Sequence, residues 1–204
     1  MSFSARGKAA ATAQWAVAIG VSTGGPKTLA TVVSQLPGSL PAAVLIVQHL
    51  PAAFAASFAA RLDACCALRV KLAEPGELLT CGTAYIAPGD VHLCARASRL
   101  SGGAVAFLPT EPADVPHRPS VDVMMRSVLS AFGSRMVSVL LTGMGCDGAD
   151  AMVEARKAGA VTIAESADSA VVFGMPKEAI RRGGAAIIAP APRIAEEIVR
   201  ALPS

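Results

Sequence analysis

The chain has 204 residues, of which 53% are hydrophobic and 16% charged; this excludes a disordered protein and suffices for one α/β domain with a substantial core. A net charge of +3, with a single Trp and a single Tyr, gives no indication of a nucleic-acid partner. Five cysteines without CxxC spacing argue against a zinc site and a disulfide framework, so we expect no metal and no cofactor.

The high apolar content raises the question of a membrane segment. Residues 28–60 carry no Lys, Arg, Asp or Glu, but Pro37, Gly38, Pro41 and Pro51 interrupt this run repeatedly. A signal peptide is also unconvincing, because cleavage after residues 16–18 would destroy the first predicted strand. We therefore expect a cytoplasmic protein without direct membrane insertion.

Short apolar runs rich in β-branched residues alternate with longer segments of helical periodicity. In chain order, the pattern predicts strands at 15–21, 43–48, 137–142, 161–164 and 185–188. It predicts helices at 28–35, 54–64, 148–158, 175–182 and 193–202. This alternation is typical of a doubly wound, mostly parallel sheet with helices on both faces.

The middle and the N-terminus of the chain depart from this pattern. Between Val70 and Leu108, short strand-like pieces are separated by Pro-Gly and Gly-Gly turns, which predict hairpins and a small antiparallel β insertion. Residues 1–12 are small and polar without periodicity, and we interpret them as a flexible tail or linker remnant. Residues 13–204 then form a single domain.

The first predicted strand runs into its helix through the segment GVSTGGP, residues 20–26. Serine on a strand-to-helix turn has an exposed hydroxyl, and the helix N-terminus offers backbone N–H groups to a developing oxyanion. Ser22 is therefore a candidate nucleophile, although Ser22 or Thr23 could instead simply cap the helix. A phosphate-binding loop is a further alternative, which Pro26 disfavours because it interrupts the spacing of a Walker A motif.

A serine nucleophile needs a base, and the chain has three histidines. His49 directly follows the predicted strand 43–48, so it lies at the same edge of the sheet as Ser22. His92 falls in the hairpin region and His117 in a loop. Position therefore favours His49 as the base, against the alternative of a purely structural histidine.

An acid follows a third strand, in the segment LTGMGCDG at residues 141–148. Asp147 in this glycine-rich loop can accept the Nδ1–H of His49, fix its tautomer and stabilise the imidazolium. Capping of the next helix is the alternative for Asp147. The competing acids are Asp90, Asp122 and Asp150, and Cys146 is a rival nucleophile for which no second histidine is positioned.

Six segments in order carry a family resemblance: IGVSTGGP, IVQHLP, YIAPGDVH, HRPSVDVMM, LLTGMGCDGA and VVFGMPKEAI. Over residues 14–200 the chain resembles the catalytic domain of CheB, the bacterial chemotaxis protein-glutamate methylesterase. The resemblance implies a doubly wound α/β fold with the triad Ser22, His49 and Asp147. It also implies oxyanion or active-site support from Thr23, Gly24 and Met144.

The resemblance further implies a substrate and partners. The substrate would be the γ-methyl ester of glutamate on the cytoplasmic helices of methyl-accepting chemoreceptors, with deamidation of receptor glutamines as a related reaction. A catalytically silent regulatory module on the same fold is the alternative, which the intact triad disfavours. CheB proteins usually carry an N-terminal receiver domain, so we interpret the chain as a stand-alone methylesterase or as a piece of a longer one.

Overall fold

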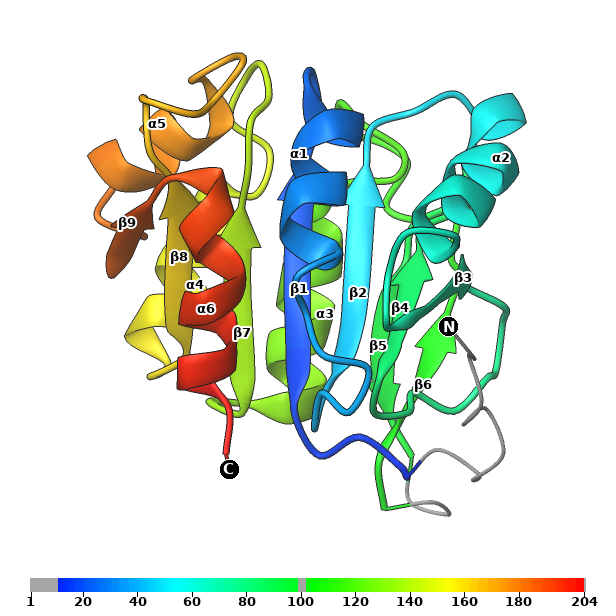
Figure 1. The fold of residues 1–204 in the computed structure, drawn as a ribbon. Coiled ribbons are helices and arrows are strands. Elements are labelled where there is room, and N and C mark those ends of the chain that lie inside the picture. Colours follow the sequence, from blue (N-terminus) through cyan, green and yellow to red (C-terminus); the bar gives the residue numbers. More distant parts are fainter. Residues whose placement is uncertain (1–10, 99–101, 204) are drawn as a thin grey trace.

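A seven-stranded sheet, parallel throughout, forms the centre of the computed structural model, which describes residues 11–98 and 102–203 (Figure 1). The strand order is β3-β4-β2-β1-β7-β8-β9, with β1 in the middle. The strands are β1 (Ala16–Val21), β2 (Ala43–Gln48), β3 (Arg69–Leu72), β4 (Thr83–Ile86), β7 (Met136–Leu140), β8 (Val161–Glu165) and β9 (Ile187–Ala189).

Helices cover both faces of this sheet, so the predicted doubly wound fold is confirmed (Figure 1). One face carries α1 (Gly25–Val33), α2 (Ala52–Asp63) and α6 (Ala191–Ala201). The other carries α3 (Val121–Phe132), α4 (Ala149–Lys157) and α5 (Met175–Arg181). Successive residues of β1 face opposite layers, since Ile19 packs in the first core and Ala18 in the second.

The start of α3 lies unusually close to the central strand. A Cβ atom added at Gly20 would lie 2.2 Å from a methyl carbon of Val121, so only glycine fits at this position of β1. Ala16 and Ala18, on the same face of β1, also have short side chains. Small residues on β1 therefore let the N-terminus of α3 approach the carboxyl end of the sheet.

The structure corrects the prediction for the middle of the chain. Among the described strands of the expected hairpin region, β5 (Cys94–Ala97) and β6 (Ala104–Phe107) form the antiparallel pair, which confirms a small antiparallel insertion. β3 and β4 instead extend the main sheet in parallel. The twelve-residue helix α3 was not predicted, and the helix expected at 28–35 begins earlier, at Gly25.

The predicted tail lies largely outside the described residues, which begin at residue 11. Cys81 donates its backbone N–H to the carbonyl of Ala11 at 2.8 Å, and Thr12 forms an isolated bridge with Thr80. All five cysteines are free thiols. In the part of the chain that is described, no helix combines the length and apolarity needed to cross a membrane.

Candidate active site

Ser22 and His49 follow neighbouring strands at the carboxyl edge of the sheet. Val21 pairs with Gln48 in the β1–β2 register, so the next residues on the two strands are adjacent. The backbone N–H of His49 donates to the Val21 carbonyl at 3.1 Å, and that of Ser22 donates to the Thr142 carbonyl at 2.9 Å. The half-buried Ser22 therefore stands between β2 and β7, in the middle of the edge where such folds bind ligands.

The turn after Ser22 is fixed by its neighbours. The side-chain amide of Gln48 donates to the Ser22 carbonyl at 2.9 Å. A Cβ at Gly143 would lie 2.8 Å from the Ser22 Cβ, so the β7 loop packs directly against the serine only because residue 143 is glycine. The turn thus presents Ser22 in one orientation.

Helix α1 receives no side-chain cap. Its N-cap residue is Gly24, in the left-handed conformation at φ 84°, and neither Ser22 nor Thr23 caps the helix as the alternative interpretation proposed. The N–H of Gly25 is already bonded to the Ser22 carbonyl at 2.9 Å, and Pro26 has no N–H. Gly25 and Pro26 therefore offer no free N–H group to a phosphate at this helix start, which weighs further against a nucleotide site.

His49 and Asp147 meet across the edge of the sheet. The Nε2 atom of His49 lies 2.9 Å from Oδ2 of Asp147, and both side chains are largely shielded, with exposed fractions of 13% and 9%. The prediction that these two residues pair is consistent with this contact, but the nitrogen involved is Nε2 and not Nδ1. With Nε2 held by the carboxylate, Nδ1 is the nitrogen left for proton transfer.

Asp147 is anchored by the N-terminus of α3. Its Oδ1 accepts hydrogen bonds from the Ser120 hydroxyl and the Asp122 N–H, both at 2.9 Å. Its Oδ2 accepts from the Val121 N–H at 2.8 Å in addition to His49. The alternative role as cap of its own helix is not observed, because Gly148 is the N-cap of α4; Asp147 caps a different helix.

These contacts determine the charge state of Asp147. Burial alone raises the pKa of its carboxyl, but the hydrogen bonds from His49, Asp122 and Val121 lower it by more, so that the pKa lies below its ordinary value of 3.8. The helix N-terminus contributes a further favourable interaction with a negative charge. At neutral pH the residue is therefore a carboxylate that receives four donors.

The three acids that compete with Asp147 for the role of the orienting acid have other partners or lie on the exposed surface. Asp150 is exposed and pairs with Arg182 at 2.6 Å. Asp122 accepts from the Ala151 N–H at 2.8 Å, and burial raises the pKa of its carboxyl. Asp90 is exposed and lies in a turn at a positive φ of 64°. None of these carboxylates makes a hydrogen bond to His49 in the described part of the chain.

Two histidines that the sequence reasoning set aside lie next to the pair. His117 stacks on His49 with 4.3 Å between ring centroids, and burial, followed by the proximity of His49, lowers the pKa of His117 below 6.5. His92 is fully buried; its Nδ1 accepts from the Ser120 N–H and its Nε2 donates to the Pro112 carbonyl. The HRPS motif, residues 117–120, was the sequence signal that could have indicated these contacts, because it joins the stacked His117 ring to Ser120 at the start of α3.

Backbone N–H groups remain available beside Ser22. The amides of Thr23, Gly24 and Met144 donate to no acceptor among the described residues. The Met144 side chain is 75% exposed, so it is not part of the buried core. The structure thus places all three predicted supporting residues around the serine with free donors.

The end of β7 is supported by a buried acid that the sequence did not single out. Glu165, fully shielded from solvent, accepts the Thr142 N–H at 2.7 Å and the Ser169 hydroxyl at 2.8 Å. Burial raises the pKa of its carboxyl above 4.5. Thr142 in turn donates its hydroxyl to the Thr23 carbonyl at 2.8 Å, which links this acid to the turn of Ser22.

Within residues 11–98 and 102–203, no group of three or more His, Cys, Asp and Glu side chains is arranged to hold a metal ion. The exposed Cys146 is a free thiol that precedes Asp147. The described geometry therefore offers one set of residues for nucleophilic chemistry: a serine, a histidine and a carboxylate at three strand ends.

Comparisons with known proteins identify relatives of this chain. The family model described as CheB methylesterase matches residues 17–198. Proteins named protein-glutamate methylesterase/protein-glutamine glutaminase are 49% identical in Caldanaerobacter subterraneus subsp. tengcongensis and 48% identical in Methanosarcina barkeri, over 90% of this chain in both cases. The chain spans about half the length of these curated relatives, 50% and 51% respectively.

A solved structure is similar over nearly the whole domain. The CheB methylesterase catalytic domain of Thermotoga maritima superposes with a TM-score of 0.88 at 40% sequence identity. The match covers 91% of this chain and 97% of that one.

Proposed function

Because the chain belongs to the CheB methylesterase family, we propose that it hydrolyses glutamate γ-methyl esters, with Ser22 as nucleophile, His49 as base and Asp147 as the orienting acid. The observation that carries the proposal is the 2.9 Å contact between His49 and Asp147, next to a serine on the adjacent strand end. These are the parts that a serine hydrolase requires.

In the first half of the reaction, Nδ1 of His49 takes the Ser22 proton as Oγ attacks the γ-carbonyl carbon of the ester. Asp147 holds the opposite side of the ring through Nε2–H and stabilises the imidazolium that forms. The tetrahedral intermediate collapses when His49 returns the proton to the methoxy oxygen. Methanol leaves, and the substrate stays attached to Ser22 as an acyl ester.

In the second half, water replaces the alcohol. His49 takes a proton from the water as it attacks the acyl ester, and the proton passes to Ser22 Oγ as the C–O bond breaks, which releases a glutamate side chain. A carboxamide can enter the same sequence with ammonia as the leaving group. We therefore propose deamidation of glutamine as a second reaction of the site.

The oxyanion of both intermediates needs donors close to Ser22. The unpaired N–H groups of Gly24 and Met144 lie on the two loops that flank the serine. Preorganised amides of this kind stabilise negative charge as it develops, and loss of one such donor costs about 10²–10³ in rate. We assign the oxyanion site to these loops, and we attribute no chemical step to the Met144 side chain.

The substrate and location are also part of the proposal. The names of the relatives support action on protein glutamates and glutamines. We propose the cytoplasmic helices of methyl-accepting chemoreceptors as the substrate, and hence the cytoplasm as the place of action and chemotactic signalling as the role.

Covalent labelling combined with turnover tests the proposal. A fluorophosphonate probe should label the wild type and a Cys146→Ser control, but not Ser22→Ala. Methanol release from methylated receptor membranes should fall by roughly 10⁴–10⁶ in Ser22→Ala. Methanol release by Ser22→Ala at the wild-type rate, with a native circular dichroism spectrum, would rule out the serine. A wild type that is neither labelled nor active would favour the silent regulatory module.

A further inference from the structure

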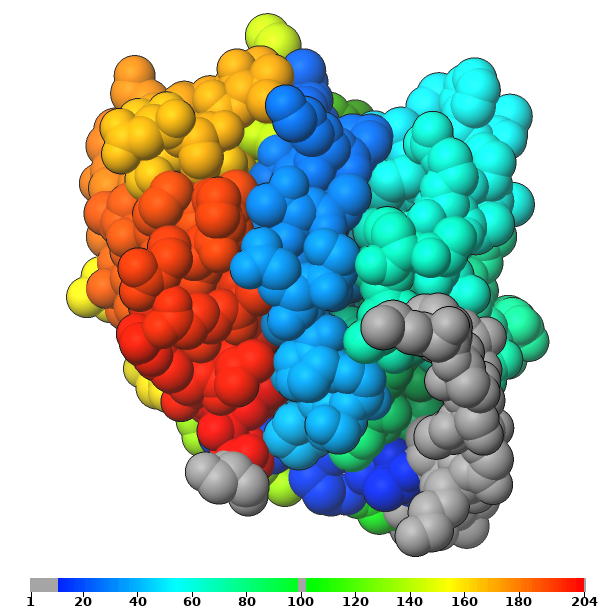
Figure 2. Space-filling model, viewed as in Figure 1, coloured from blue at the N-terminus to red at the C-terminus, as the bar shows by residue number. Residues whose placement is uncertain are grey.

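A furrow on the molecular surface runs between α1 and α2 and reaches the candidate site (Figure 2). It consists of three adjoining hollows of about 360, 600 and 260 Å³. The first two share Phe58 and Arg61, and the last two share Leu50 and Pro51. The third hollow is lined by His49 itself. This α1–α2 groove is thus continuous with the proposed catalytic machinery.

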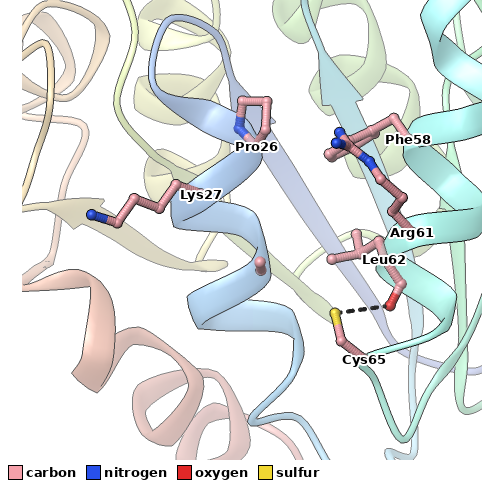
Figure 3. A pocket seen from close by; sticks show the side chains of 7 residues that line it. Pro26, Lys27, Phe58, Arg61, Leu62 and Cys65 are labelled. Carbon is pink, nitrogen blue, oxygen red and sulfur yellow. Dashed lines mark hydrogen bonds between the residues drawn. The ribbon is translucent and has the colours of Figure 1, made fainter.

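The groove has an apolar floor and an exposed aromatic side chain. Figure 3 shows Phe58, Arg61 and Leu62 of α2 reaching toward Pro26 at the start of α1. Phe58 is only 3% exposed, whereas Phe54, one turn earlier on α2, is 59% exposed. Aromatic side chains exposed beside a hollow are typical of surfaces that bind another protein.

The charges around the groove are all positive. Arg61 is exposed and makes no ion pair among the described residues, and the same holds for Arg118 at the end near His49. Lys27 also borders the first hollow, but its side chain points away from α2 (Figure 3). Among the residues that the structure describes, no acidic side chain lines any of the three hollows. Asp63, the one acid of α2, accepts the Val70 N–H and does not line the groove.

Two arginines on the opposite face of the molecule are neutralised by neighbours. Arg126 pairs with Glu154 at 2.9 Å, and Arg182 with Asp150 at 2.6 Å. The groove therefore keeps a positive potential that its own side chains do not offset. Such a surface attracts and orients an acidic partner.

We propose that the α1–α2 groove docks an acidic, amphipathic helix of the substrate protein, namely the helix that carries the esterified glutamate; this rests on the proposed function. The apolar face of that helix packs on the exposed Phe54, and its carboxylates face Arg61 and Arg118. From Pro51 to Arg61, α2 spans about 15 Å. If the substrate helix lies along α2 with its target glutamate at Ser22, the residues about ten positions from that glutamate in the substrate helix therefore lie beside Arg61.

The test compares a protein substrate with a small one. For each variant, kcat/KM is measured on methylated receptor membranes and on p-nitrophenyl acetate, which is too small to reach the groove. Arg61→Glu should lower the ratio of these two values about tenfold or more, mainly through KM for the receptor, and Phe54→Ser should lower it too. Lys157→Glu is the matched control, because Lys157 is also exposed and also lies in the last turn of a helix, but on the opposite face.

A binding measurement separates the groove from the chemistry. In a Ser22→Ala background, added Arg61→Glu should weaken binding of methylated receptor membranes about tenfold, and high salt should weaken binding more strongly in the protein that retains Arg61. An unchanged ratio and unchanged binding would overturn the groove proposal even if the triad is correct. Lost binding together with an inactive wild type would uphold the groove and refute the proposed hydrolysis.

Discussion

Replacing Asp147 by asparagine perturbs four hydrogen bonds while keeping the shape of the side chain. Each carboxylate oxygen receives two donors: Oδ1 from Ser120 and Asp122, and Oδ2 from Val121 and His49. Asparagine keeps one acceptor oxygen, so its NH₂ group must face one of these pairs. If the oxygen stays with Ser120 and Asp122, the NH₂ group faces the Val121 N–H and His49 Nε2.

The magnitude follows from those contacts. A buried backbone N–H left without an acceptor costs about 1–3 kcal/mol, and loss of the negative charge at the N-terminus of α3 adds up to about 1 kcal/mol. We therefore expect Asp147→Asn to unfold with about 2–4 kcal/mol less free energy, yet to remain folded at 25 °C. His49 Nε2 then accepts a hydrogen bond, so the proton moves to Nδ1 and the base is lost, which should cost about 10⁴ in rate.

The assay combines urea unfolding with the initial rate of methanol release. Because the folded-state pKa of Asp147 is depressed, its contribution to stability is present above pH 3.8 and is lost as the pH falls through the folded pKa. The stability difference between wild type and Asp147→Asn should therefore shrink in acid below that value. Asp150→Asn, an exposed matched control, should cost less than about 1 kcal/mol and leave the rate unchanged. Equal rates for wild type and Asp147→Asn would refute the orienting role of Asp147. A large loss of rate in Asp150→Asn would show that Asp150 is the orienting acid instead.

Three further substitutions test the surroundings of the site. Gly20→Ala should lose about 1–3 kcal/mol and most activity, because its Cβ would push Val121 away; wild-type urea unfolding would contradict this. Ser120→Ala should lower the free energy of unfolding by about 1 kcal/mol, because it removes both the α3 cap and one donor to Asp147. Its rate should fall less than that of Asp147→Asn, since three donors to the carboxylate remain. An equal fall in rate would contradict this reasoning. Glu165→Gln should gain stability relative to wild type as the pH rises above 4.5. The folded-state pKa of the Glu165 carboxyl is raised, so its stabilising contribution exists below 4.5 and is lost at higher pH. A pH-independent difference in the free energy of unfolding would refute the raised pKa.

Local sequence patterns were sufficient to predict the alternating strands and helices of the parallel sheet. Strands β1, β2 and β7 are buried on both faces, so they read as continuous apolar runs, and their ends gave the three candidate residues of the triad. The position of Ser22 next to His49 follows from parallel strands alone, since all carboxyl ends lie at one edge. These expectations needed no long-range information.

The remaining features depend on contacts between distant segments. β3 and β4 have turn residues between them, which suggest a hairpin, but they pair with each other in parallel, and β4 also pairs with β2, an earlier segment of the chain. The anchoring of Asp147 by α3 was equally hidden, because aspartate before a helix normally caps that helix. Helix α3 itself had a usable signal, since Val121, Met124, Met125 and Val128 are apolar at helical spacing.

The central position of β1 has a consequence for how the proposed active site forms during folding. Its pairing with β7, which joins Ala16 to Met136, closes the longest loop of the sheet, and contacts of such long range form slowly. Ser22 and His49 are synthesised early, but Asp147 reaches His49 only after that closure. In a refolding experiment, esterase activity should therefore return only with the slowest phase, after most helical signal has recovered. A partly folded chain would carry an unactivated serine and would be harmless to other esters in the cell.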